Sequence, residues 1–385
     1  MPDRHHILDR LKAVLQTHYA AGLGRALLPI DSREGQNVRM LGEECLDFSS
    51  NDFLGLAQDR QAARELAKLS QTSGCGSGSS RSVTGTRRST LDAENALAAY
   101  FGYESCLILG SGFLANLTLI STLFGDNDTL ILDKRAHTST VAGVLHCRAR
   151  FHTFQHNSLD HLEKVLHAHP AEAVLTESLF SMDADSPDFF CMEKLKQKFN
   201  FLCIVDEAHA LGVLGEGGRG LAHNVADMTV GTLGKAFGLF GAFLLIPEIV
   251  REYLINFGQG FIYTTALPPW HGDMVLAMLQ RISQADDRRD HLRRLASTAR
   301  TLLRDAGLAV RGQAHILAIE VGDAARCQLL AQALRRCGIL VFAARYPTVP
   351  LGRAMLRICL TSRHTENDIR SLRDALINVQ DAMRP

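Results

Sequence analysis

The chain has 385 residues, enough for two domains and a large buried core. Its 46% hydrophobic and 21% charged residues are ordinary for a globular protein. The 41 basic and 41 acidic residues cancel, so the charge gives no indication of a nucleic-acid or other polyanionic partner.

The sequence predicts a cytoplasmic protein. Nine cysteines lie between Cys45 and Cys359 without a CxxC pair or a His/Cys metal spacing, which favours free thiols over disulfides or a metal site. Residues 1–16 have the pattern of an amphipathic helix and lack the apolar run of a secretory signal. Apolar stretches such as 241–247 are far too short to span a bilayer, so we expect no membrane partner.

Short apolar runs then alternate with helical patterns, which is typical of βαβ units and a mostly parallel sheet. The predicted strands are Cys106–Leu109, Thr129–Asp133, Ala173–Glu177, Leu202–Asp206, Met228–Gly231 and Gly241–Ile246. The predicted helices are Phe113–Phe124, Leu159–His169 and Met192–Phe199. Runs such as LILD and CIVD stay apolar until their last residue, which fits strands buried on both faces. Ligands of such sheets bind beyond the carboxyl ends of the strands, so polar residues there are candidates for chemistry.

The pattern changes after about Trp270. A charged helix at Asp286–Asp305 is followed by two strand–helix units and a strand at Met355–Thr361, which together predict a smaller α+β domain. We therefore expect an N-terminal arm at residues 1–45, a large domain at 46–270 and a small domain at 271–385. The charged helix is expected to bury an apolar stripe and to expose a group of arginines to solvent: Arg288, Arg289, Arg293 and Arg294.

The first candidate for chemistry is the segment GTLGKAFG, which follows a predicted strand and contains Lys235. Glycines let the backbone approach a ligand closely, and a lysine there can react with a carbonyl group once it has lost its proton. A lysine in an ordinary surface loop is the alternative. The segment is not a phosphate-binding Walker loop, because Ala236 stands where that loop needs Ser or Thr.

The second candidate is VDEAH, in which Asp206 ends a predicted buried strand and His209 follows three residues later. A carboxylate in such a place is costly without a charged partner, and a protonated pyridine nitrogen would be one. An Asp that caps a helix explains this motif equally well. A DExH helicase does not, because no phosphate loop precedes the motif and the chain has no basic surplus.

Two weaker signals come from the turns after two other predicted strands. Gly110, Ser111 and Gly112 enter a helix whose N-terminal N–H groups could hold a phosphate, although a plain strand–helix turn would look the same. The segment from Asp133 to His137 could place an imidazole over a flat ring, and a structural histidine is the alternative.

Six segments, including these four, follow one another in a recognisable order: GSGF, D-x3-H, TESLFSMD, VDEAH, TxGKAFG and YTTALPP. From Leu46 to Thr361 the chain resembles the α-oxoamine synthase family of fold-type I pyridoxal-phosphate enzymes. The resemblance implies an α/β fold, with a large domain built on a mostly parallel sheet and a smaller C-terminal α+β domain. It also implies pyridoxal 5'-phosphate as the cofactor and a cytoplasmic homodimer.

The resemblance assigns the catalytic roles to four residues. Lys235 binds the cofactor covalently and later acts as the base that removes the substrate Cα proton. Asp206 pairs with the pyridine nitrogen, His209 contacts the ring hydroxyl, and His137 stacks on the ring.

The other implied site residues contact the phosphate or the substrates. Gly112, Phe113 and Thr232 would contact the phosphate, and Thr265 would reach it from the partner subunit, so the two subunits would share each site. Ser181 is a further cofactor contact. Three residues would contact substrate, with the arginine holding the amino-acid carboxylate: Asn51, Thr348 and Arg357.

The implied reaction joins an amino acid to an acyl thioester, with loss of carbon dioxide and release of the thiol. Residues 80–85 and 345–350 favour the branch that joins L-alanine to a pimeloyl thioester in biotin synthesis. GTLGKAFG also occurs in glycine-using relatives that make 5-aminolevulinate or 2-amino-3-oxobutyrate, and ALGVLGEGGRG resembles serine palmitoyltransferase. Residues 75–80, 86–90 and 186–193 depart from the usual family pattern. These departures leave the length of the acyl chain undetermined. The carrier of the acyl group is also undetermined and could be coenzyme A or a carrier protein.

Two other classes of function fit the sequence less well. A dinucleotide-dependent dehydrogenase would need a GxGxxG turn directly after its first strand and an acidic residue about 20 residues further on, and the sequence lacks that combination. A catalytically idle partner subunit would typically lack the lysine that binds the cofactor, whereas Lys235 is present.

Overall fold

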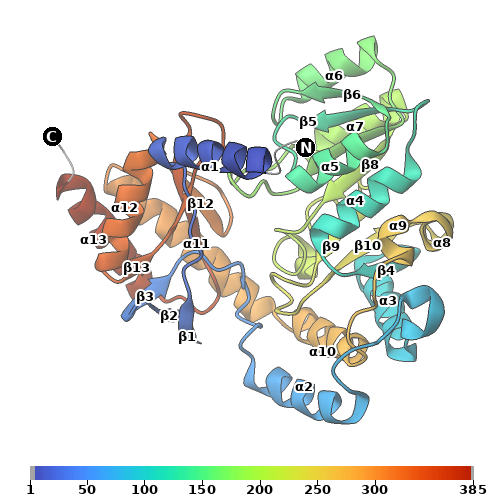
Figure 1. The fold of residues 1–385 in the computed structure, drawn as a ribbon, viewed down its shortest axis with the longest axis horizontal. Coiled ribbons are helices and arrows are strands. Elements are labelled where there is room, and N and C mark those ends of the chain that lie inside the picture. Colours follow the sequence, from blue (N-terminus) through green and yellow to red (C-terminus); the bar gives the residue numbers. More distant parts are fainter. Residues whose placement is uncertain (1–4, 383–385) are drawn as a thin grey trace. The chain divides into compact units, whose positions relative to one another are not determined.

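The computed structural model describes residues 5–382 and divides the chain into two compact units (Figure 1). The larger unit contains residues 51–181 and 185–291. The smaller unit contains the chain up to Ser50, residues 182–184, and the chain from Leu292 onward. The limits at residues 45 and 270 that we expected from the sequence stay a prediction.

A seven-stranded sheet forms the centre of the larger unit, in the order β4-β10-β9-β8-β7-β5-β6. Its strands are β4 (Ser105–Leu109), β5 (Thr129–Asp133), β6 (Arg150–Phe154), β7 (Ala173–Glu177), β8 (Leu202–Asp206), β9 (Met228–Thr232) and β10 (Ala242–Ile246). Strands β9, β8, β7, β5 and β6 run parallel, and β10 is antiparallel to both of its neighbours. The predicted mostly parallel sheet is thus confirmed.

Helices cover both faces of this sheet (Figure 1). The helices of the larger unit are α2 (Arg60–Ser73), α3 (Arg88–Phe101), α4 (Gly112–Leu123), α5 (Thr138–His146), α6 (Leu159–Ala168), α7 (Phe189–Phe199), α8 (Glu248–Phe257), α9 (Gln259–Ile262) and α10 (His271–Ser283). Alternate residues of a strand enter different cores. Leu130 and Leu132 of β5 pack with α4, α5, α8 and α9, whereas Ile131 packs with α6 and α7. Burial on both faces explains why these strands are mostly apolar instead of alternating between apolar and polar residues.

The smaller unit contains two four-stranded sheets. One joins β1 (Ile30–Glu34), β2 (Asn37–Met40) and β3 (Glu43–Asp47) to β13 (Ile339–Leu340), and the other has the order β11 (Val310–Arg311), β12 (Ile316–Gly322), β15 (Ala354–Cys359) and β14 (Phe342–Ala344). Its helices are α1 (His5–Ala20), α12 (Ala324–Arg336) and α13 (Glu366–Ala382). Residues 1–4 of the predicted N-terminal helix lie outside the described residues.

Helix α11 (Asp286–Asp305) has the predicted limits, but the prediction that its arginines face solvent is wrong for Arg289. This side chain is 7% exposed and donates hydrogen bonds to the carbonyl oxygens of Gly212 (3.0 Å) and Ile282 (2.9 Å). Arg288 is half-buried and donates to the carbonyl oxygen of Leu54, whereas Arg293 and Arg294 are exposed. The helical periodicity cannot show that distant carbonyl groups need a donor at that position.

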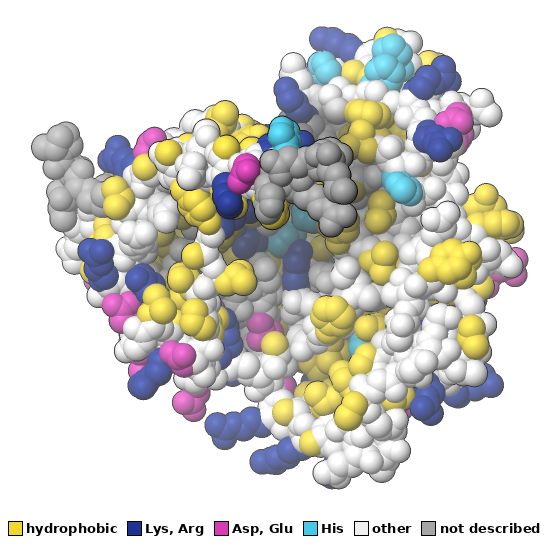
Figure 2. All heavy atoms as spheres, in the orientation of Figure 1, with side chains coloured by type: hydrophobic (Ala, Val, Ile, Leu, Met, Phe, Trp, Pro, Cys, Tyr) yellow, Lys and Arg dark blue, Asp and Glu magenta, His cyan; other side chains and the backbone are white. Residues whose placement is uncertain are grey.

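The surface carries both signs of charge. Figure 2 shows Lys and Arg side chains interspersed with Asp and Glu on the face in view, in keeping with the balanced composition. All nine cysteines are free thiols. Between residues 5 and 382, no helix combines the length and the apolar character needed to cross a membrane.

Candidate active site

The register of the large sheet brings the carboxyl ends of five strands to one edge. Ala242 of β10 pairs with both the last residue of β4 and the last residue of β9. Asp206, which ends β8, pairs with Val230 of β9 and with Glu177, which ends β7. Strand β5 lies parallel to β7 and ends at the same side. Most of the predicted cofactor-binding residues end these strands or follow them: Gly112, Phe113, His137, Ser181, Asp206, His209, Thr232 and Lys235.

Lys235 and His209 form the closest pair at this edge. The Nζ atom of Lys235 lies 2.8 Å from Nε2 of His209, and the histidine is almost fully buried. The lysine loop is tight, because Gly238 has a φ of 65° and a Cβ there would lie 2.3 Å from the backbone nitrogen of Ala57. The Oγ1 atom of Thr232 accepts a hydrogen bond from the N–H of Gly234 (3.1 Å) within the same loop. These contacts hold Lys235 against the imidazole.

Asp206 is oriented by two donors on different elements. Its Oδ2 atom accepts a hydrogen bond from the side-chain amide of Asn116 in α4 (2.7 Å), and its Oδ1 atom accepts from the N–H of Ala208 (2.9 Å). Asn116 is 2% exposed and also donates to Oγ of Ser139 in α5 (3.0 Å). A carboxylate held by two donors keeps a defined direction, as a partner for a ring nitrogen requires.

His137 lies in the same electrostatic environment. Its Nδ1 atom lies 2.7 Å from Oγ of Ser139 and accepts a hydrogen bond from the N–H of that serine (3.3 Å). Burial lowers the pKa of His137, the Asp206 carboxylate opposes this shift, and the Lys235 ammonium adds to it. His137 as a whole residue is nevertheless exposed, so it is not enclosed in the core.

The N-terminus of helix α4 opens onto free space. A Cβ at Gly112 would meet no atom within 4 Å, and the cap residue Ser111 accepts a hydrogen bond from the N–H of Leu114 (3.2 Å). The N–H groups of Gly112 and Phe113 have no partner within the helix, as in the first turn of any α-helix. Asn116 lies four residues from Gly112, about 6 Å along the helix axis, and it contacts Asp206. The N-terminus of α4, which suits an anion, and the oriented Asp206 carboxylate are therefore close enough for one small molecule to contact both.

Two further predicted residues belong to loops beside this group. Asn51 precedes Phe53, whose buried ring lies 5.9 Å from the ring of His209. Ser181 is half-buried in the turn after β7, where the N–H of Phe180 donates to the carbonyl oxygen of Asp185 (2.9 Å).

The remaining three predicted residues belong to other segments of the chain. Thr265 is exposed and forms an isolated β-bridge with Ser80. Thr348 and Arg357 belong to the smaller unit. Thr348 is exposed and accepts a hydrogen bond from Arg25 (3.0 Å), and Arg357 is 4% exposed in β15. The roles of all three residues stay predictions.

Sequence reasoning missed two buried carboxyl groups beside the site. Burial raises the pKa of Glu177 well above its ordinary range, and the Asp206 charge adds to this shift. Glu207 is 1% exposed and accepts hydrogen bonds from the N–H groups of Leu221 (3.0 Å) and Ala222 (2.7 Å), which fixes the glycine-rich loop after VDEAH. Glu177 ends an apolar run just as Asp206 does, so the pattern used for Asp206 could have identified it.

A second group that the sequence did not indicate is centred on His156. Its Nδ1 atom lies 2.9 Å from Asp133, which ends β5, and its Nε2 atom lies 3.1 Å from Asp185. Burial opposes charging, but the hydrogen bonds and charges of these two carboxylates prevail and raise the pKa of His156 to about 10. The imidazolium therefore joins the turn that leads to His137 with the turn that contains Ser181.

We expect His156 to make the stability of the protein depend on pH. Its pKa is raised on folding from about 6.5 to about 10, so its contribution is complete below pH 6.5 and is lost as the pH rises through 10. In urea unfolding, the stability difference between wild type and His156→Gln should shrink by roughly 2–4 kcal/mol over that range. Asp185→Asn should remove part of this dependence. A stability difference that stays constant with pH would contradict the ion pair.

These groups fit a cofactor that contains a phosphate, a carbonyl carbon and a basic ring nitrogen. The open N-terminus of α4 suits the phosphate, and Lys235 suits the carbonyl. The oriented Asp206 carboxylate suits a protonated ring nitrogen, and the imidazole of His137 suits the flat face of a ring. Pyridoxal phosphate has all of these features.

Comparison with known proteins gives consistent matches over most of the chain. The model of the family "Aminotransferase class I and II" matches residues 43–376. An 8-amino-7-oxononanoate synthase from Vibrio campbellii is 35% identical over 371 residues, which cover 96% of this chain and 97% of the relative.

Two solved structures are also similar. A serine palmitoyltransferase from Sphingomonas wittichii has 28% identity and a TM-score of 0.92, over 99% of this chain and 98% of that one. An 8-amino-7-oxononanoate synthase from Francisella tularensis has 28% identity and a TM-score of 0.78, over 88% of this chain and 98% of that one. The chain therefore belongs to the aminotransferase class I and II family, has the fold of its fold-type I members, and falls among the α-oxoamine synthases.

Proposed function

We propose that this enzyme uses pyridoxal 5'-phosphate to condense L-alanine with a pimeloyl thioester, forming 8-amino-7-oxononanoate, carbon dioxide and the free thiol. The observation that carries the proposal is the grouping of Lys235, His209 and Asp206 at one sheet edge, in a chain similar to 8-amino-7-oxononanoate synthases over nearly its whole length. The product would serve biotin synthesis.

The cofactor would be held from three sides. Lys235 would bind it covalently through Nζ, Asp206 would pair with the ring nitrogen, and the first turn of α4 with Thr232 would bind the phosphate. His137 would lie against the ring and Ser181 beside it, while His209 would contact the ring hydroxyl. The bound cofactor supplies an electron sink for the pair left on the substrate Cα.

The side chains then divide the work on the substrates. Lys235, once displaced from the cofactor by the amino acid, would take the Cα proton on Nζ, with His209 at 2.8 Å to orient it. Asp206 would keep the ring nitrogen protonated, and Asn116 would keep Asp206 in place. We assign the amino-acid carboxylate to the planar fork of Arg357, and further substrate contacts to Asn51 and Thr348.

We further propose a homodimer in which Thr265 of each subunit contacts the cofactor phosphate of the other. Thr265 is an exposed residue in the single chain, which is consistent with a contact to a second chain.

A specific observation favours a second candidate. The serine palmitoyltransferase has the higher TM-score of the two solved structures, 0.92 against 0.78. A condensation of serine with a longer acyl thioester, or of glycine as in other relatives, is therefore the alternative within the same chemistry.

Thiol release distinguishes these candidates. Protein loaded with pyridoxal phosphate is supplied with pimeloyl-CoA or with a pimeloyl carrier protein, and with L-alanine, glycine or L-serine in turn. We expect rapid release with alanine alone and a product with the mass of 8-amino-7-oxononanoate. Release with glycine or serine, or only with another acyl chain, would contradict this assignment while leaving the family intact. Protein carrying Lys235→Ala gives the blank rate.

A further inference from the structure

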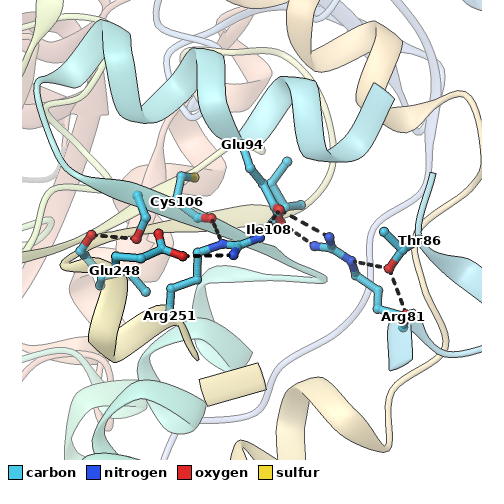
Figure 3. A network of polar contacts seen from close by, with 9 residues as sticks. Arg81, Thr86, Glu94, Cys106, Ile108, Glu248 and Arg251 are labelled. Carbon is cyan, nitrogen blue, oxygen red and sulfur yellow. Dashed lines mark hydrogen bonds and ion pairs between the residues drawn. The ribbon is translucent and has the colours of Figure 1, made fainter. Parts of the chain in front are cut away.

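A buried network of ionic contacts is centred on Glu94 in helix α3 (Figure 3). Glu94 is 1% exposed, and Arg81 contacts both of its carboxylate oxygens through Nη1 and Nη2. The N–H of Ile108 in β4 donates to it (2.8 Å), and Nη2 of Arg251 lies 3.4 Å away. A buried carboxylate is stable only with such partners, so Glu94 ties its neighbours firmly to the strand that leads to the Gly110 turn.

Arg81 is the member of the network that reaches a different segment. It begins the short helix η1 (Arg81–Gly85), and its guanidinium lies 5.3 Å from the centre of the Phe261 ring. Its Nε atom donates to Oγ1 of Thr86 (3.4 Å), and that hydroxyl donates back to the carbonyl oxygen of Arg81 (2.7 Å). The side chain is 9% exposed, and its contacts to Glu94, Thr86 and Phe261 hold it in one position.

The residues around Arg81 hold the segment 264–267 by its backbone. The N–H of Ala266 donates to the carbonyl oxygen of Ser79 (2.9 Å), and Oγ of Ser77 donates to the carbonyl oxygen of Ala266 (2.7 Å). Ser80 forms a β-bridge with Thr265. A Cβ at Gly85 would lie 2.6 Å from Cβ of Ala266, so the two segments are in close contact.

We propose that Arg81 is a positioning residue that, through Glu94 and the backbone bridge at Ser80, holds Thr265 ready for the cofactor phosphate of the partner subunit. The inference rests on the proposed function, because the phosphate contact of Thr265 belongs to it. In the alternative arrangement, Arg81 and Thr265 serve the cofactor of their own subunit. That arrangement has to be tested because Arg81, Gly110 and Thr265 line one small cavity of the same chain.

Cofactor affinity gives the first test. Arg81→Gln should raise the dissociation constant of pyridoxal phosphate about 10-fold, because a displaced Thr265 loses a hydrogen bond to a charged group. Arg251→Gln is the matched control: it removes the same charge from Glu94, and the polar contacts of Arg251 go to Glu94, Glu248 and the carbonyl oxygen of Cys106, so the affinity should not change. Arg81→Lys keeps the charge but cannot make the bidentate contact with the Glu94 carboxylate, so it should give an intermediate affinity. If Arg81→Gln and Arg251→Gln changed the affinity equally, the positioning role would be rejected.

Mixed dimers test whether Arg81 acts across the subunit boundary. Two differently tagged chains are co-expressed, and the dimers that carry both tags are isolated. Each of these dimers contains one Arg81→Gln and one Lys235→Ala substitution. With the substitutions on separate chains, the subunit that keeps Lys235 receives an intact Thr265 segment from its partner, and we expect wild-type cofactor affinity at that site. With both on one chain and a wild-type partner, the remaining site should bind the cofactor about 10-fold more weakly.

The opposite pattern would show that Arg81 serves its own subunit and would overturn the proposal. Equal affinities in the two arrangements would reduce Arg81 to a structural role, because both dimers contain the same substitutions. Repeating the comparison with Thr265→Ala in place of Arg81→Gln tests the shared site itself. The expected result for a residue that acts across the boundary is wild-type affinity with the substitutions on separate chains and weakened affinity with both on one chain. If the Thr265 dimers show this result and the Arg81 dimers do not, only this inference fails. If neither does, the shared site of the proposed function fails with it.

Discussion

Replacement of Lys235 by alanine is expected to lower kcat at least about 10³-fold, because the variant loses both the covalent attachment of the cofactor and the base that removes the substrate proton. The structure adds a specific reason. The Nζ atom of Lys235 lies 2.8 Å from His209, and the tight backbone at Gly238 leaves the loop little freedom to bring another amine to the same place.

Two variants separate this chemical role from a general loss of stability. Lys235→Arg keeps the positive charge but cannot form the bond to the cofactor, so it should be as inactive as Lys235→Ala. Lys198→Ala removes a surface lysine whose Nζ atom lies 2.6 Å from Glu163, and exposed ion pairs of this kind contribute little to stability, so its activity should match wild type.

Mass spectrometry after borohydride treatment gives a readout independent of turnover. The cofactor should be fixed to the peptide that contains Lys235 in the wild-type protein, and no peptide of Lys235→Ala should gain that mass. A Lys235→Ala variant that kept a tenth of the wild-type kcat, or a cofactor fixed to another lysine, would contradict the assignment.

The strands that were predicted correctly share one physical property, which is burial on both faces. Strands β5, β7 and β8 are mostly apolar and end in an acidic residue, so their limits could be read from the sequence residue by residue. Strand β6 was missed because it lies at the sheet edge, where the RFHTF segment exposes most of its side chains. The strands β1 to β3 were missed because they are short and give little apolar pattern. In addition, β3 pairs with β13, about 290 residues further along the chain, and no local sequence pattern reveals that pairing.

The candidate site divides in a similar way. Residues such as Asp206 and His137 could be proposed because they follow apolar strands, and parallel strands bring their ends to one edge. The groups that hold them could not. Asn116 is an ordinary helical residue until the packing of α4 places its amide 2.7 Å from Asp206. Arg289 was assigned to solvent because helical periodicity does not report a carbonyl oxygen contributed by a distant loop.

Replacement of Asp206 by asparagine is expected to lower kcat/KM by about 10²–10³-fold with little change in fold. An amide has nearly the shape of the carboxylate and can still accept the hydrogen bond from the N–H of Ala208, but it has no charge to keep a ring nitrogen protonated. Asp227→Asn is a closely matched control. Asp227 also accepts from one backbone N–H, that of Cys203 (2.7 Å), and from one side chain, that of Lys196 (2.7 Å), beside the opposite end of β8.

Exchange of the Cα proton of L-alanine with deuterated water, measured without an acyl donor, isolates the step on which Asp206 should act. The exchange rate should fall in Asp206→Asn by a factor similar to that of kcat/KM, and should stay at the wild-type value in Asp227→Asn. Equal losses in the two variants would mean that the carboxylate acts through stability alone. A normal exchange rate with slow thiol release would place the role of Asp206 after proton removal, in the acyl transfer. Loss of exchange in Asp206→Asn alone would locate the electron demand of the reaction at the carboxyl end of β8, because Asp227 lies beside the opposite end of that strand.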